Sequence, residues 1–193
     1  MNKEEIEIFY PKSITAWRIW LEKNHLSKQA VWLVFHNKSS QKKSLTWTEA
    51  VDIALCFGWI DSKRIKIDEE TSHQFFSKRK AKSTWSKINK QKVEKLIAAG
   101  QMREEGYRTI ETAKLNGSWT IFDDAEELII PKDLKAEFRK RPVGKAYYES
   151  LSRSVKKGIL QWIVLAKRPE TRQKRITEIV ERAEQKLKPK HMQ

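Results

Sequence analysis

Hydrophobic and polar positions follow two different periods in the first part of the chain. The alternation in "EIEIF" and the β-branched and aromatic run in "QAVWLVFHNK" predict strands at residues 5–9 and 29–38. Between them, "SITAWRIWLEKN" spaces two tryptophans and a leucine by three and four positions. That spacing predicts an amphipathic helix, and Ser13 is suited to cap its start.

The next segment carries clear start and stop signals. Thr46 and Glu49 have the spacing of a capping box, in which the hydroxyl and the carboxylate each satisfy a free backbone amide. The helix then runs through "AVDIALCF" and ends at Gly58, which suits the left-handed closing position. The alternating "WIDSKRIKID" (59–68) and "HQFFSK" (73–78) follow and predict a β-hairpin.

Helical periodicity dominates from Ser83 onward. "STWSKINKQKVEKLIAAG" predicts a helix that Ser83 caps and Gly100 closes, and "REEGYRTIETAKLNG" predicts another that ends near Gly117. The apolar stripe expected on the first of these helices consists of Trp85, Ile88, Val93, Leu96 and Ile97.

A loop over residues 118–131 leads to four more predicted helices, in "DLKAEFRKR", "KAYYESL", "SRSVKKGILQWIVLAKR" and "PETRQKRITEIVERAEQKL". Ser152 is suited to cap the third, and Pro169 suits the first turn of the last. The prediction is an α+β domain over 1–122, with packed helices on a small mixed sheet, and an all-helical domain over 123–193. Whether these two parts pack as one unit stays open. The stripe expected on the last helix is Ile176, Val180, Ala183 and Leu187.

Composition adds a strong positive charge to this picture. The 193 residues include 40 lysines and arginines against 25 acidic residues, a net charge of +15. Such a charge serves solubility, or it attracts polyanions such as nucleic acid. Residues 153–190 hold twelve basic and four acidic residues, so they form either the solvated face of a packed helix or a basic arm that binds phosphates without sequence specificity.

Several classes of function find no support in the sequence. Cys56 is the only cysteine, which excludes an intrachain disulfide and a cysteine-based zinc site, and its apolar neighbours favour a core position. The histidines show no metal-ligand spacing, and the sequence lacks a glycine-rich phosphate loop and a G-x-S-x-G elbow. We therefore expect no metal and no cofactor. The four histidines are His25, His36, His73 and His191.

The N-terminal sequence bears on location. "MNKEEIEIFY" has acidic residues where a signal peptide needs a basic and then an apolar run. No apolar stretch approaches the roughly 20 residues that span a bilayer. The prediction is a cytoplasmic protein without a membrane span.

The segment "FFSKRKAKSTWSKINK", Phe75 to Lys90, is the best candidate for a ligand site. If Ser83 caps the helix, the next amides form an open helix end with partial positive charge, and basic residues precede it. A helix N-terminus with adjacent cations binds phosphate, sulfate or carboxylate. The alternative is that Ser83 only caps, Trp85 fills the core and the lysines are solvated. The predicted ligand-binding residues are Trp59, Asp61, Arg64, Arg79, Lys80, Lys82, Ser83, Thr84, Trp85, Ser86 and Asn89.

Asp61 is the one candidate for a catalytic group. It follows Gly58 in the turn "GWIDSKR", where it can orient Arg79 or act as a base. The alternative is an aspartate that lies on a surface turn at the start of a strand.

Three separated motifs carry a resemblance to a known family. At "CFGWIDSKRIKID", "SKRKAKSTWSKIN" and "LAKRPETRQKRI", in this order, the sequence resembles the YdeI/OmpD-associated family, also called bacteriocin-protection proteins. The resemblance runs through nearly the whole chain. Similar proteins often carry glycine where Ser62 stands and proline where Lys78 stands. The resemblance implies bacteriocin tolerance or association with a porin, and no established reaction, cofactor or catalytic residue.

The function expected from the sequence is a non-enzymatic binding or stress-tolerance protein with an anion-binding cleft. One alternative is an enzyme that acts on a small phosphorylated or carboxylated substrate through Asp61 and Arg79. The other is non-specific nucleic-acid binding through the basic surface. The sequence does not predict the oligomeric state.

Overall fold

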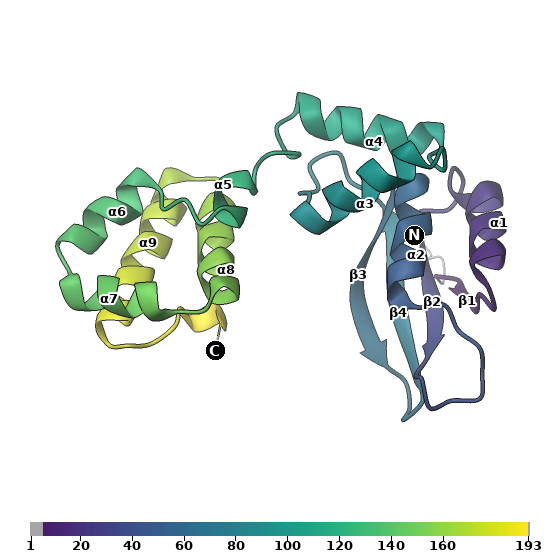
Figure 1. The fold of residues 1–193 in the computed structure, drawn as a ribbon, viewed down its shortest axis with the longest axis horizontal. Helices are drawn as coiled ribbons and strands as arrows, with labels where there is room; N and C mark the ends of the chain where they lie inside the picture. The colour runs from purple at the N-terminus through teal and green to yellow at the C-terminus, as the bar shows by residue number, and fades with distance from the viewer. Residues whose placement is uncertain (1–5, 193) are drawn as a thin grey trace, which may run out of the picture. The chain divides into compact units, whose positions relative to one another are not determined.

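The structure, a computed structural model, describes residues 6–192 and divides into two compact units. Unit 1 is Met1–Trp119 and unit 2 is Thr120–Gln193. Unit 1 contains a four-stranded sheet with helices, and every regular element described in unit 2 is helical (Figure 1). The prediction of an α+β fold with an all-helical C-terminal part is confirmed.

Unit 1 is built on a mixed sheet with the strand order β1-β2-β4-β3. β1 runs parallel to β2, whereas β4 is antiparallel to both β2 and β3. The predicted hairpin is therefore present. The first residue of the strand predicted at 5–9 lies outside the described residues. The elements are β1 (Ile8–Phe9), α1 (Ile14–Asn24), β2 (Ala30–His36), α2 (Trp47–Cys56), β3 (Trp59–Lys66), β4 (Thr71–Lys78), α3 (Lys87–Ala98) and α4 (Glu104–Leu115).

The local signals in unit 1 act as the sequence predicts. The Ser13 hydroxyl accepts a hydrogen bond from the Ala16 amide at the start of α1. At α2, Thr46 and Glu49 exchange both bonds of the capping box. Gly58 then takes a left-handed φ of +71°, which lets the chain turn directly from α2 into β3.

One face of the sheet, the inner face, forms the core of unit 1 with α1 and α2. β2 alternates strictly, so that Val31, Leu33 and Phe35 are buried and their neighbours are not. Figure 1 shows α2 lying across the sheet. Aromatic rings dominate this core, and Trp17 lies between Trp20 and Phe76 at ring distances of 5.2 and 5.6 Å.

The start of α3 differs from the prediction. Ser83 does not cap this helix, because Ser86 does so and accepts a hydrogen bond from the Asn89 amide at 3.2 Å. Serine is a favoured N-cap residue, so the local sequence does not distinguish Ser83 from Ser86 as the start of the helix. The later start lets Trp85 remain on non-helical backbone, where it is only 1% exposed. The predicted stripe is correspondingly narrower, since Ile88 and Ile97 are exposed and only Val93 and Leu96 of α3 are buried.

Unit 2 has a mainly aliphatic core that also contains Phe138 and Tyr148, and each long helix contributes one apolar face to it. Ser152 caps α8 and Pro169 lies in the first turn of α9, as predicted. Leu187 does not join the stripe of α9, because the helix ends at Glu184 and Lys186 takes a left-handed φ of +56°. The elements are α5 (Asp123–Glu126), α6 (Lys132–Arg139), α7 (Pro142–Ser150), α8 (Arg153–Val164), α9 (Pro169–Glu184) and a 3₁₀ helix (Lys190–Met192).

None of the helices described over residues 6–192 is both long and apolar enough to cross a membrane. The cytoplasmic location stays a prediction.

Candidate functional site

A pocket of about 150 Å³ opens in unit 1 between the segment after β4 and helix α4. Cationic and hydroxyl-bearing side chains make up most of its wall, and one buried indole closes it. The lining residues are Arg79, Lys80, Ala81, Trp85, Arg108, Thr109 and Thr112.

Arg79 is the most constrained of these cations. Its backbone amide donates to the Gly58 carbonyl at 2.9 Å, which continues the hairpin by one residue beyond β4. Its guanidinium carbon lies 3.7 Å from the centre of the Trp85 ring, and Nη1 donates to the Thr84 carbonyl at 3.2 Å. A guanidinium stacked on an indole at this distance gains a cation–π interaction and is held in one orientation.

The Arg79 guanidinium is also poorly compensated. Burial lowers its pKa to about 10, against the opposing influence of the Asp61 carboxylate. At neutral pH the group is therefore still protonated. Its Nε atom is buried and has no hydrogen-bond partner among residues 6–192. A buried donor without an acceptor costs free energy that an anion in the pocket can recover.

Two glycines bring α4 close enough to form the opposite wall. A Cβ atom on Gly58 would lie 2.7 Å from the Thr109 methyl and 2.8 Å from the Glu105 carbonyl. A Cβ atom on Gly106 would collide with the Cys56 carbonyl, where α2 ends. Only glycine permits such a close approach at these two positions. The approach places the α4 residues Thr109 and Thr112 in the same pocket wall as Arg79.

The sequence analysis missed the α4 side of the pocket. Arg108, Thr109 and Thr112 lie within one helical face at spacings of one and three or four. That pattern of a cation beside two hydroxyls was visible, but nothing in the sequence showed that this face meets the segment after β4.

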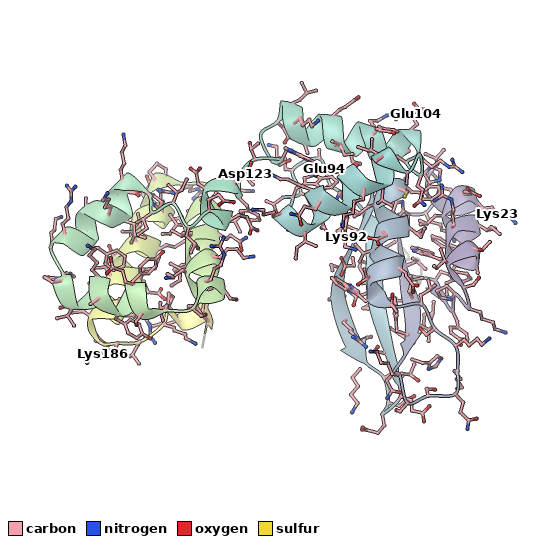
Figure 2. The ribbon with its side chains drawn as sticks, in the orientation of Figure 1. Lys23, Lys92, Glu94, Glu104, Asp123 and Lys186 are labelled. Atoms are coloured by element: carbon pink, nitrogen blue, oxygen red, sulfur yellow. The ribbon has the colours of Figure 1, made fainter. Side chains whose placement is uncertain are left out.

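Arg108 already has acidic partners. Its Nη2 lies 2.9 Å from Glu104 and its Nη1 3.1 Å from Glu105, both on the same helix. The Arg108 and Glu104 side chains are 61% and 85% exposed, so these pairs contribute little to stability and exchange easily. Figure 2 shows Glu104 at the start of α4, on the outside of the unit.

The structure brings together only part of the predicted ligand set. Arg79, Lys80 and Trp85 line the pocket. Lys82 is exposed in the turn that follows, the Ser83 amide closes this turn by donating to the Lys80 carbonyl, and Thr84 comes next on irregular backbone. Ser86 and Asn89 form the cap of α3. The predicted cap at Ser83 is wrong, because α3 is capped by Ser86, and anion binding by these residues stays a prediction.

Three other predicted residues lie on the strands, away from the pocket wall. Trp59 is fully buried, and its indole nitrogen donates to the His25 carbonyl at 3.4 Å. Arg64 donates twice to the Ser72 hydroxyl, at 2.7 and 2.9 Å.

Asp61 is the third. It accepts hydrogen bonds from Trp47 Nε1 at 2.8 Å and from Gln74 Nε2 at 3.3 Å. Its link to Arg79 is limited to a longer-range attraction, since it raises the Arg79 pKa without lining the pocket.

The described residues contain no cluster of three or more histidine, cysteine, aspartate or glutamate side chains that could hold a metal ion. His36 is paired with Thr71 and His73 with Val34, so the two strand histidines are not opposite each other. Cys56 is buried, and burial raises the pKa of its thiol. It is a core residue, as predicted.

These features define an α+β protein with a small cationic pocket in its N-terminal unit and a helical C-terminal unit. Residues 127–186 match the family described as bacteriocin-protection, YdeI or OmpD-associated, and residues 9–109 match a domain of unknown function (DUF8412). The chain belongs to this DUF8412 family, whose match covers more than half of it, whereas the similarity to the bacteriocin-protection family is confined to residues 127–186. No curated protein and no solved structure matches the chain.

The predicted resemblance to the bacteriocin-protection family is thus confirmed, but it covers a smaller part of the chain than predicted. Of the three motifs that carry it, only "LAKRPETRQKRI" lies within residues 127–186. The other two, which include Asp61 and Arg79, lie within residues 9–109. The pocket therefore belongs to the domain whose family has no described function.

Proposed function

We propose that the chain is a non-enzymatic binding protein of the bacteriocin-protection type, and that its N-terminal unit holds a small anion in the pocket between Arg79 and α4. The family of the C-terminal unit supports the protective role. The pocket supports the ligand class, because three of its seven lining residues are cations and two are threonines.

The observation that carries this proposal is the state of Arg79. A charged guanidinium that is desolvated, stacked on Trp85 and left with a free Nε is costly unless it serves a partner. A phosphate, sulfate or carboxylate supplies acceptors that match its planar donor group.

Size restricts the ligand to a compact group. The pocket volume of about 150 Å³ is below the roughly 300–1,000 Å³ typical of pockets for drug-sized ligands. An inorganic oxyanion or the terminal carboxylate or phosphate of a larger molecule fits this space. A whole nucleotide does not, so a nucleotide would place only a phosphate there.

An enzymatic role has less support. A general base must reach a proton on a bound substrate, whereas Asp61 is engaged by Trp47 and Gln74 and is not part of the pocket wall. Its charge instead favours the protonated form of Arg79.

The proposal is tested by isothermal titration and thermal shift with phosphate, sulfate and acetate, each at two salt concentrations. A ligand that binds only the folded protein raises the melting temperature, and binding in a partly desolvated pocket persists at moderate salt. Replacing Arg79 with Gln should weaken binding by about 1.5–3 kcal/mol, the usual contribution of a charge-assisted hydrogen bond. Lys82→Gln is the matched control, since Lys82 is exposed and outside the pocket.

Equal binding by wild type and Arg79→Gln contradicts the proposal, as does the absence of any response to all three anions. Conversion of a phosphorylated or carboxylated compound that stops in Asp61→Asn would establish the enzymatic alternative instead.

A further inference from the structure

The face of the sheet opposite to the core, which we call the outer face, presents aromatic side chains toward solvent. Trp32 on β2 and Phe75 on β4 are directly paired in register, with ring centres 4.9 Å apart. The next pair, Val34 and His73, continues the row, and the His73 ring lies 6.5 Å from Trp32. All four are only partly buried, and none belongs to the buried core of unit 1 or packs against it.

A β-bulge adds a cation to this face. Asp61 pairs with Phe76 and Arg64 pairs with Gln74, so β3 has one residue more than β4 between these two pairs. Ser62 and Lys63 therefore oppose Phe75 together. The Lys63 ammonium lies 5.2 Å from the Trp32 ring centre and 5.5 Å from that of Phe75.

The charges of the strands are complementary to a polyanion. Asp61 is the only acidic residue within the described strands β1 to β4, and its hydrogen bonds to Trp47 and Gln74 place it on the inner face. The acidic residues of the β3–β4 turn have partners of their own, and Glu70 accepts a hydrogen bond from the Ser40 hydroxyl at 2.8 Å. Asp68 accepts from two backbone amides of the turn, and Glu69 pairs with Lys66 at 2.7 Å.

We propose that the outer face of the sheet binds single-stranded nucleic acid, with bases stacked on Trp32 and Phe75 and with Lys63 on a phosphate. Adjacent aromatic rings beside a cation are the combination that holds unpaired bases and their backbone without reading sequence. Paired bases hide their ring faces within the duplex, so a double strand gains only the electrostatic part. A buried Lys63 ammonium needs an acceptor, which every phosphate of a nucleic-acid strand supplies, whereas a protein partner would need an acceptor group at this one position.

This inference is independent of the anion pocket. It concerns different residues on different elements, and either proposal can fail while the other holds.

The test is fluorescence anisotropy of labelled twelve-residue oligonucleotides, dT₁₂ and rU₁₂, titrated with the full chain at several salt concentrations. A duplex of equal length is the comparison ligand. We expect the single strands to bind more tightly than the duplex. Trp32→Leu and Phe75→Leu should each weaken single-strand binding roughly 5- to 150-fold, the range that corresponds to about 1–3 kcal/mol for one stacked base.

Two further variants separate stacking from charge. Trp32→Phe keeps an aromatic ring and should retain most of the affinity that Trp32→Leu loses. Lys63→Gln should reduce the slope of log affinity against log salt by about 0.7, the value for one phosphate contact to a single strand. Trp47→Leu is the matched control, because Trp47 is 47% exposed but lies on α2, on the other side of the sheet.

Several results overturn the proposal. These are equal binding of duplex and single strand, no binding of either twelve-mer, or equal losses in Trp32→Leu and Trp47→Leu. A dimer in size-exclusion chromatography that Trp32→Leu dissociates, with oligonucleotide affinity unchanged, assigns the face to protein association. If Trp32→Leu lowers the melting temperature strongly, Trp32→Phe and Lys63→Gln decide the question.

Discussion

The two units carry nearly the same charge but arrange it differently. Unit 1 has 22 basic and 14 acidic residues, a net charge of +8, and unit 2 has 18 and 11, a net charge of +7. Figure 2 shows charged side chains distributed over both units. Among the residues that the structure describes, Arg79 of unit 1 is the cation that combines burial with a side-chain nitrogen, Nε, that has no hydrogen-bond partner.

The basic residues of unit 2 that approach its interior already have acceptors. Arg172 makes two bonds to the Asp133 carboxylate, at 2.6 and 3.0 Å. Lys157 lies 3.3 Å from the carboxylate of the buried Glu126, and Arg153 donates to the Glu126 carbonyl. Net charge therefore attracts anions to both units alike. A binding site requires, in addition, a cation with a hydrogen-bond donor that no protein group satisfies.

The hydrophobic cores of the two units also differ in composition and in their relation to the pocket. Unit 1 packs tryptophan and phenylalanine rings under a sheet, and Trp85 extends this aromatic core to the pocket wall. Unit 2 packs mainly isoleucine, leucine, valine and alanine between helices, with one aromatic pair, Phe138 and Tyr148. In unit 1 the core is thus part of the candidate site, and in unit 2 we find no comparable link.

The largest expected effect comes from Trp85→Ala. Trp85 is 1% exposed, and a tryptophan-to-alanine change in a core costs about 3–5 kcal/mol of unfolding free energy. The variant should also lose the anion response, because Arg79 loses the ring on which it rests. Chemical denaturation and titration with phosphate measure the two effects.

Ile163→Ala is the counterpart in unit 2, where Ile163 is fully buried. It should cost about 2–5 kcal/mol and leave phosphate binding unchanged. Hydrogen exchange in α8 and α9 measures the local loss. If phosphate affinity falls as well, the distinction between the two cores is wrong.

The helices of unit 2 could be predicted from the sequence, whereas the pocket of unit 1 could not. Helix positions in unit 2 follow from apolar periodicity and from caps such as Ser152 and Pro169, since both signals are local. The individual strands, the hairpin and the capping box of unit 1 are equally local, whereas the strand order β1-β2-β4-β3 joins segments that are far apart in the chain. The pocket is not, because Arg79 and Thr109 meet only through the approach of α4 to Gly58.

The error at Ser83 has a similar cause. Two serines compete as caps with equal local chemistry, and burial of Trp85 beside Trp119, at a ring distance of 4.9 Å, accompanies the choice of Ser86. Tertiary contacts of this kind leave no trace in the spacing of residues.

The next effect in size concerns the close approach that forms the pocket. Gly58→Ala introduces both a left-handed φ for alanine and a collision with Thr109, so we expect a loss clearly above the roughly 1–2 kcal/mol of backbone strain. Gly100→Ala is the control: its φ is +63°, but nothing lies within 4 Å of the added carbon. Thermal melting and phosphate titration compare the two, and equal losses would show that α4 is free to move.

A smaller effect is expected from the ion pair of unit 2. The hydrogen bond from Arg172 lowers the pKa of Asp133 below its usual value of 3.8, against the opposing effect of burial. Because the folded pKa is lowered, the pair stabilises the fold above pH 3.8, and this contribution disappears as the pH falls through the folded pKa. Asp133→Asn should cost at most about 1 kcal/mol at pH 7, since the carboxylate is 40% exposed. Denaturant unfolding measured between about pH 2.5 and 7 should show that the unfolding free energy of the variant falls less steeply at acid pH than that of the wild type.

The smallest effect is expected at Asp61. Asp61→Asn removes a charge that favours protonated Arg79 but keeps the size of the side chain. Arg79 stays protonated at pH 7, so phosphate affinity should change less than about twofold, a difference of roughly 0.4 kcal/mol. A loss of tenfold or more would make Asp61 part of the site after all.

The bulge in β3 also has a consequence for solubility. β3 is an edge strand, since it pairs only with β4 in the described sheet, and its outer rim offers free backbone groups to any other strand. β3 carries Lys63, Arg64 and Lys66, and the extra residue between Asp61 and Arg64 breaks the regular spacing of this edge. A second copy that tried to extend the sheet would set like charges against each other with mismatched hydrogen bonds. The edge is therefore protected against amyloid-like growth of the sheet.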